Sequence, residues 1–161
     1  TLITSSAASD VYKRQIGIIN IPATGERWIG GKDLPANLNG VEVKVRKGLA
    51  LSEATLASTS PKMFVGKDAE RIQRVQDKVK LPIFGGDCYL YGMLTLGTID
   101  LVIEASMSDY DYLAPTAMVH AAGGVVTGWA GEQLGLGTTD KIVAAGDPKL
   151  HAEVIKLLND D

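Results

Sequence analysis

From residue 81 to the C-terminus, short apolar runs alternate with longer segments that have the pattern of helices. The runs LPIF (81–84), IDLVIEA (99–105) and KIVAAG (141–146) have the length and composition of β-strands. The segments between and after them begin at capping residues and end at glycines, as helices do. This alternation predicts an α/β domain in which sheets and helices pack as layers.

The expected helices can be bounded from their ends. A glycine turn and Asp87 precede a largely apolar helix that Gly97 stops, and we expect this helix to be buried. A second helix begins around Asp111 and runs to residue 122, before GGVVTGW turns into another strand. At the C-terminus, Asp147 is expected to cap a helix with proline at its first position.

The first half of the chain has the pattern of β-hairpins followed by one helix. A strand at 16–22 and a second strand at 27–31 flank a turn, and an Asn-Gly turn precedes VEVKV (41–45), whose alternation predicts a half-buried strand. Between residues 68 and 80, apolar residues recur every three or four positions, which predicts an amphipathic surface helix. No repeat or linker divides the chain, so we expect one domain.

Residues 1–15 do not fit this pattern. TLITSSAASDVYKRQ has no apolar periodicity and lacks the hydrophobic core of a signal peptide. One back-translation of DVYKRQ resembles a sequence carried by transposase-based sequencing adapters. We therefore interpret residues 1–15 as an artefactual leader and residues 16–161 as the genuine part of the chain.

Composition excludes several classes of protein. The chain has 161 residues, of which 45% are hydrophobic and 22% charged, as in globular proteins. Its net charge is -3 and its basic residues are scattered, which argues against nucleic acid as a partner. No apolar run approaches the roughly 18 residues of a membrane span. The single cysteine, Cys88, has no internal disulfide partner, so we expect a buried structural thiol and a cytoplasmic location.

Carboxylates gather just before the helix in EASMSDYDYLAPTAMVHAAGG (104–124). Asp111 can be a simple helix cap, or it can point toward a cation or substrate while Ser108 and Asp109 cap the helix. Glu104 ends a strand, where a carboxylate usually meets solvent. Both readings of each residue stay open on local pattern alone.

The other candidates also have a structural alternative. Asp87 can cap the following helix, bind a ligand, or do both, since a carboxylate has two oxygens. The glycines Gly85 and Gly86 allow close approach of a ligand to the backbone, but a plain turn would also favour them. His120 and His151 have no metal-ligand spacing to other residues, so surface or helix-flank roles are expected.

Several motifs resemble the inositol monophosphatase family, and most closely its histidinol-phosphate phosphatase branch. YDYLAP followed by AAGGVVTGWAG is similar to the family's C-terminal signature, and GGDCY with GTIDLVIEA resembles the branch's substrate-binding segment. IGIINIPATGERWIGG resembles the family's hairpin after its first metal-binding segment. The resemblance implies the family's layered sheet-and-helix α/β sandwich, of which this chain is the C-terminal part.

The resemblance also assigns roles to residues. It implies that Asp111 is a ligand of Mg²⁺ and that Gly85, Gly86, Asp87, Glu104 and Asp111 bind substrate. The family's upstream Glu motif and Asp-Pro-x-Asp-Gly-Thr motif, which hold most metal ligands and activate the water, are not in this chain. No catalytic residue is therefore expected in it, and the chain alone is expected to be inactive.

Three functions remain to be distinguished. The resemblance favours Mg²⁺-dependent hydrolysis of a small phosphomonoester, histidinol phosphate, in histidine biosynthesis. The nearest alternative is an inositol-1-phosphatase or a related sugar or nucleotide phosphatase. A non-catalytic α/β binding module is a third reading, and homodimerisation is expected by analogy with the family.

Overall fold

The first sheet of the computed structural model, which describes residues 16–160, is antiparallel and has four strands. In the order β1-β2-β3-β4, they are Ile16–Ile21, Glu26–Gly31, Leu34–Leu38 and Val41–Glu42. The predicted hairpin of β1 and β2 is confirmed. Asn39 and Gly40 form the two-residue turn between β3 and β4 with φ of 50° and 86°, the backbone that such a turn requires.

The second sheet is mixed and has five strands in the order β6-β5-β7-β9-β8. Its strands are β5 (Thr55–Ser58), β6 (Leu81–Phe84), β7 (Leu101–Glu104), β8 (Val125–Gly128) and β9 (Ile142–Ala145). β5 lies parallel to both β6 and β7, whereas β9 runs antiparallel to β7 and β8. The ends of β5 and β7 therefore meet at one edge of the sheet.

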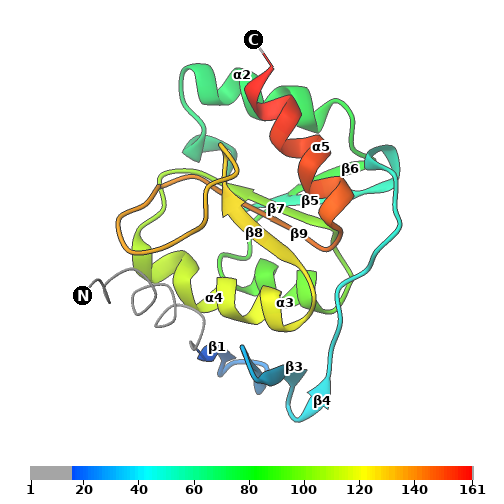
Figure 1. The fold of residues 1–161 in the computed structure, drawn as a ribbon, viewed down its shortest axis with the longest axis vertical. Coiled ribbons are helices and arrows are strands. Elements are labelled where there is room, and N and C mark those ends of the chain that lie inside the picture. Colours follow the sequence, from blue (N-terminus) through cyan, green and yellow to red (C-terminus); the bar gives the residue numbers. More distant parts are fainter. Residues whose placement is uncertain (1–15, 161) are drawn as a thin grey trace, which may run out of the picture.

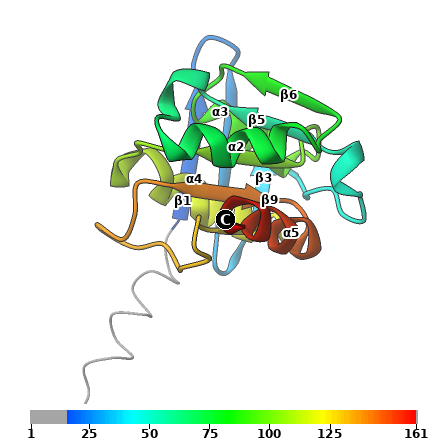
Figure 2. The same cartoon turned by 90° about the horizontal axis from the view of Figure 1, so that it is seen from above.

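Helices fill the space between the two sheets and cover the far face of the second one (Figures 1 and 2). α3 (Tyr89–Thr95) and α4 (Asp109–Ala121) form the inner layer, and α2 (Lys67–Gln76) and α5 (Pro148–Asn159) form the outer layer. Short 3₁₀ helices span Leu51–Glu53 and Pro61–Met63. The predicted layered α/β fold and the buried character of the helix after Asp87 are confirmed.

Two predicted elements are shorter than expected. Only Val41 and Glu42 of the segment 41–45 pair in a ladder, because the chain then leaves the sheet edge and the Val45 amide donates to the Ala122 carbonyl. The predicted alternation still holds, since Val43 and Val45 are buried. The helix expected over 68–80 ends at Gln76.

Two strands were not predicted. β3 has the sequence LPANL, and its proline and asparagine are residues that strands usually lack. β5 has only four residues, TLAS, and all but Thr55 are buried. It is a strand because it pairs with β6 and β7, whose partner residues lie 26 or more positions later in the chain.

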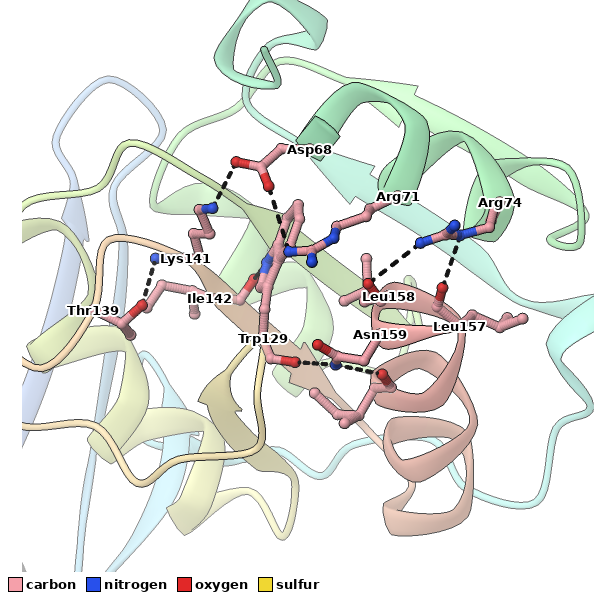
Figure 3. Close-up of polar contacts among 11 residues, drawn as sticks. Asp68, Arg71, Arg74, Trp129, Thr139, Lys141, Ile142, Leu157, Leu158 and Asn159 are labelled. Carbon is pink, nitrogen blue, oxygen red and sulfur yellow. Dashed lines mark hydrogen bonds and ion pairs between the residues drawn. The ribbon is translucent and has the colours of Figure 1, made fainter. Parts of the chain in front are cut away.

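The outer layer is joined to the rest by polar contacts shown in Figure 3. Lys141, just before β9, lies 2.7 Å from the Asp68 carboxylate of α2. The Arg74 side chain of α2 donates to the Leu157 carbonyl of α5 over 3.1 Å, and the Asn159 amide donates to the Trp129 carbonyl over 2.7 Å. These contacts stabilise the packing of α2 and α5.

Candidate active site

A hollow of about 480 Å³ opens where β5 and β7 end and where α3 and α4 begin. Polar side chains from five segments line it: Asn20, Thr59, Asp87, Tyr91, Glu104, Tyr110 and Asp111. The structure therefore brings together three of the five predicted site residues. In α/β proteins, ligands commonly bind at the carboxyl ends of strands, as this hollow would allow.

Glu104, the last residue of β7, does not meet solvent as a carboxylate at a strand end usually would. The residue is only 1% exposed. Thr59 donates a short hydrogen bond to its Oε1, and the Tyr91 hydroxyl donates to its Oε2 over 2.6 Å. Burial raises the pKa of the Glu104 carboxyl, while the hydrogen bonds from Thr59 and Tyr91 oppose that rise.

Asp87 lies in the turn before α3 with a φ of 46°, and it does not cap that helix. Cys88 occupies the cap position, and α3 has no side-chain cap hydrogen bond. The alternative in which Asp87 is a helix cap is therefore wrong. Its exposed carboxylate lines the hollow and contributes to the raised pKa of Glu104, so the two acidic groups are near neighbours.

Asp111, at the third position of α4, has a structural role as well as a place in the hollow. Its Oδ2 accepts a hydrogen bond from the Ser108 amide over 2.9 Å, as in a capping box. Ser108 is the N-cap of α4, as expected. Asp109 instead accepts from the Tyr112 hydroxyl and the Gly137 amide, so the expectation that Asp109 also caps the helix and leaves Asp111 free of capping is wrong. One oxygen of Asp111 has no hydrogen bond within residues 16–160.

The two predicted glycines support the turn rather than the wall of the hollow. Gly85 and Gly86 have φ of 98° and 115°, which favours glycine at both positions. The Gly85 amide donates to the carbonyls of Ser58 and Thr59, so it attaches the end of β6 to the end of β5. Neither glycine lines the hollow, and their contact with substrate stays a prediction.

Thr59 and Tyr91 were missed by the sequence analysis. Thr59 directly follows β5, and the parallel register of Ala57 with Val102 places it beside Glu104. Because β5 was not predicted, no local signal pointed to this neighbour. Tyr91 lies on the predicted buried helix α3, but nothing in its spacing indicated that its hydroxyl reaches a carboxylate 13 positions later.

Cys88 and the histidines complete the comparison with the sequence. Cys88 is exposed at the hollow, so the expectation of a buried thiol is wrong. Partial desolvation and the nearby Asp87 charge raise the pKa of its thiol, which disfavours a reactive thiolate. His120 is exposed near the end of α4, as expected. His151 is buried on α5 beside Thr127, contrary to the expected surface role.

Metal binding depends on more than Asp111. Within the part of the chain that the structure describes, no group of three or more His, Cys, Asp or Glu side chains could hold a metal ion. The free oxygen of Asp111 is the hard donor that Mg²⁺ prefers, so the residue fits the role of one ligand among several.

Within residues 16–160, no helix is long and apolar enough to cross a membrane.

The layered fold and the acidic hollow at the strand ends define an α/β domain of the kind that binds a small polar ligand. The sequence model of the inositol monophosphatase family matches residues 9–161, and the chain belongs to that family. This confirms the resemblance seen in the motifs.

Relatives and solved structures agree with this membership. The chain is 38% identical over 150 residues to the bifunctional phosphatase IMPL2, chloroplastic, of Arabidopsis thaliana, covering 89% of this chain and 43% of that protein. A histidinol-phosphatase of Streptomyces coelicolor is 29% identical over 156 residues, which are 92% of this chain and 57% of that one.

Among solved structures, an inositol monophosphatase from Zymomonas mobilis superimposes with a TM-score of 0.87 at 37% identity, covering 90% of this chain and 57% of the other. The chain thus spans about half the length of the proteins it matches.

Proposed function

We propose that this chain forms part of a Mg²⁺-dependent phosphomonoesterase that acts on histidinol phosphate in histidine biosynthesis. The observation that supports this most directly is the convergence of Asp87, Glu104 and Asp111 on one hollow. Histidinol phosphate carries an ammonium group at neutral pH, whereas inositol is neutral. A charge-assisted hydrogen bond contributes about 1.5–3 kcal/mol, and tenfold in affinity corresponds to about 1.4 kcal/mol.

Each carboxylate has a separate part in this proposal. Asp87 and Glu104 bind the ammonium group, whose positive charge relieves the repulsion between them. Asp111 keeps one oxygen on its helix cap and offers the other to a metal ion. Mg²⁺, when bound, polarises the phosphate and lowers the pKa of a water ligand. The remaining ligands would come from outside residues 16–160, so we expect no phosphatase activity from the 161-residue chain alone.

A second candidate is an inositol-1-phosphatase or a related sugar or nucleotide phosphatase. The likeness to the Zymomonas mobilis inositol monophosphatase, at 37% identity, supports it as strongly as the histidinol-phosphatase relatives support the first. The two candidates differ in the charge of the group that enters the hollow, and this difference can be measured.

The test compares two substrates in the protein expressed from its intact gene. We expect kcat/KM for histidinol phosphate to exceed that for inositol 1-phosphate by about tenfold or more. Asp87→Ala should reduce this ratio mainly by lowering the rate with histidinol phosphate. Asp33→Ala, which removes an equal charge at an exposed site away from the hollow, is the matched control.

Other outcomes assign the alternatives. Equal rates with the two substrates, or an unchanged ratio in Asp87→Ala, would favour the inositol-type enzyme. A complete absence of phosphate release would favour the non-catalytic binding module.

We also propose a reducing location such as the cytoplasm, because Cys88 has no disulfide partner in the sequence. By analogy with the family we propose a homodimer, which sedimentation would test.

A further inference from the structure

The Glu104 carboxylate is held from two sides by hydroxyl groups. Thr59 bonds to one oxygen, and Tyr91 bonds to the other over 2.6 Å, a length typical of a hydroxyl donating to a charged acceptor. Burial raises the pKa of Tyr91 well above its ordinary value, so its hydroxyl keeps the proton that it donates. The Thr59 backbone also donates to the Glu104 carboxylate, which has about four acceptor sites in all, so capacity remains for a ligand in the hollow.

The surroundings of Glu104 otherwise disfavour a charged carboxylate. The titratable groups that share the hollow are Asp87, Cys88, Tyr91, Tyr110 and Asp111. None of them is cationic, and no lysine, arginine or histidine from residues 16–160 lines the hollow. Burial and the Asp87 charge raise the pKa of Glu104, and the hydrogen bonds from Thr59 and Tyr91 oppose them. Without the two hydroxyls, Glu104 would more readily take up a proton and lose its attraction for a cation.

We propose that Thr59 and Tyr91 are positioning residues that hold Glu104 as an oriented, negatively charged acceptor for the ammonium group of a substrate. This inference rests on the proposed function for the identity of the cation. It adds two residues from separate elements, the end of β5 and the inner face of α3, to the site.

The first test measures Glu104 directly and needs no substrate. In the protein expressed from its intact gene with ¹³C-labelled glutamate, the carboxyl resonance of Glu104 is followed against pH. Thr59→Val and Tyr91→Phe should each raise its titration midpoint by about one pH unit, because each removes a hydrogen bond to the ionised form. Thr59→Ser, which keeps the hydroxyl, should stay near the wild type.

Tyr112→Phe is the matched control. Tyr112 is also a buried tyrosine that donates to a carboxylate, that of Asp109, over 2.7 Å, but neither residue lines the hollow around Glu104. Its loss should leave the Glu104 midpoint unchanged. If Tyr91→Phe does not fold, the pair Thr59→Val and Thr59→Ser decides the question.

The second test separates positioning from general damage to the protein. Thr59→Val should lower kcat/KM for histidinol phosphate about fivefold or more, mainly through KM, and should move the acidic limb of the pH profile upward. The value for inositol 1-phosphate should change less than about twofold, and Thr59→Ser should restore the wild-type behaviour.

An unchanged Glu104 midpoint in Thr59→Val, or equal losses with both substrates, would overturn the positioning role. Equal wild-type rates on the two substrates would instead overturn the proposed function. The Glu104 midpoints report on the two hydroxyls whichever substrate the protein prefers, so the two failures are distinguishable.

Discussion

His151 shows how one buried side chain ties stability to pH. It lies on α5 with its Nε2 2.9 Å from the Thr127 hydroxyl of β8, and burial lowers the pKa of its imidazole. The folded protein therefore favours the neutral ring, whereas the unfolded chain takes up a proton near the ordinary pKa of about 6.5. Stability attributable to His151 is present above that pH and is lost as the pH falls toward the lower folded-state pKa.

We predict that the free energy of unfolding decreases between pH 7.5 and pH 5.5, and that His151→Gln flattens this decrease. The wild type should lose more stability than the variant across the interval, because only the wild type has a buried imidazole whose folded-state pKa lies below its unfolded value. Urea denaturation at a series of pH values measures it. His120→Gln tests the second histidine, whose pKa burial also lowers but whose hydrogen bond with the Val126 backbone opposes that shift, so it should flatten the slope less. An equally steep slope in His151→Gln would refute the assignment.

At the scale of elements, the position of α4 depends on how closely β1 approaches it. A Cβ atom added to Gly17 would lie 2.0 Å from the Ala114 carbonyl oxygen, so only glycine allows this contact. The same helix places Asp111 and part of the wall of the hollow. The packing of the antiparallel sheet and the geometry of the candidate site are thus linked.

We predict that Gly17→Ala lowers the free energy of unfolding by about 2–3 kcal/mol, because the backbone must move to accommodate the methyl group. Gly25→Ala, in the turn of the same hairpin, is the control: its φ is 71° but a Cβ there meets nothing within 4 Å. It should cost only about 1 kcal/mol of backbone strain. Urea denaturation compares the two, and equal costs would contradict a close β1–α4 contact.

At the scale of the whole molecule, the helices of residues 16–160 pack on one face of the antiparallel sheet (Figure 1). On β1, Gly17 and Ile19 face the helices, while Ile16 and Ile18 are 62% and 53% exposed. Ile18 pairs with Ile29 of β2, which is half-buried. An apolar face of this kind on a separately expressed chain favours association.

We predict that the 161-residue chain self-associates and that the double variant Ile18→Thr, Ile29→Thr shifts it toward the monomer. Threonine keeps the β-propensity of the strands while removing apolar surface. Light scattering after gel filtration measures the mass. Leu136→Thr, an exposed leucine in the loop between β8 and β9, is the control. A monomeric wild-type chain would refute self-association through this face of the sheet.

Local patterns were enough to predict the elements whose signals lie within a few residues. The alternation of strand and helix after residue 81, the Asn39–Gly40 turn and the Asp147 cap were all confirmed, because turn chemistry, capping and amphipathic periodicity act between near neighbours. Asp87, Glu104 and Asp111 were selected by their motif, and their convergence on one hollow agrees with that selection.

Tertiary contacts decided what no neighbouring residue could indicate. β5 is a strand because it lies between β6 and β7, and this placement brings Thr59 to a carboxylate 45 positions away. Burial of His151 and exposure of Cys88 likewise depend on which layers meet at each side chain. Chemical type and local spacing are properties of the sequence, whereas burial and the partners of a charged group arise only when distant segments pack together.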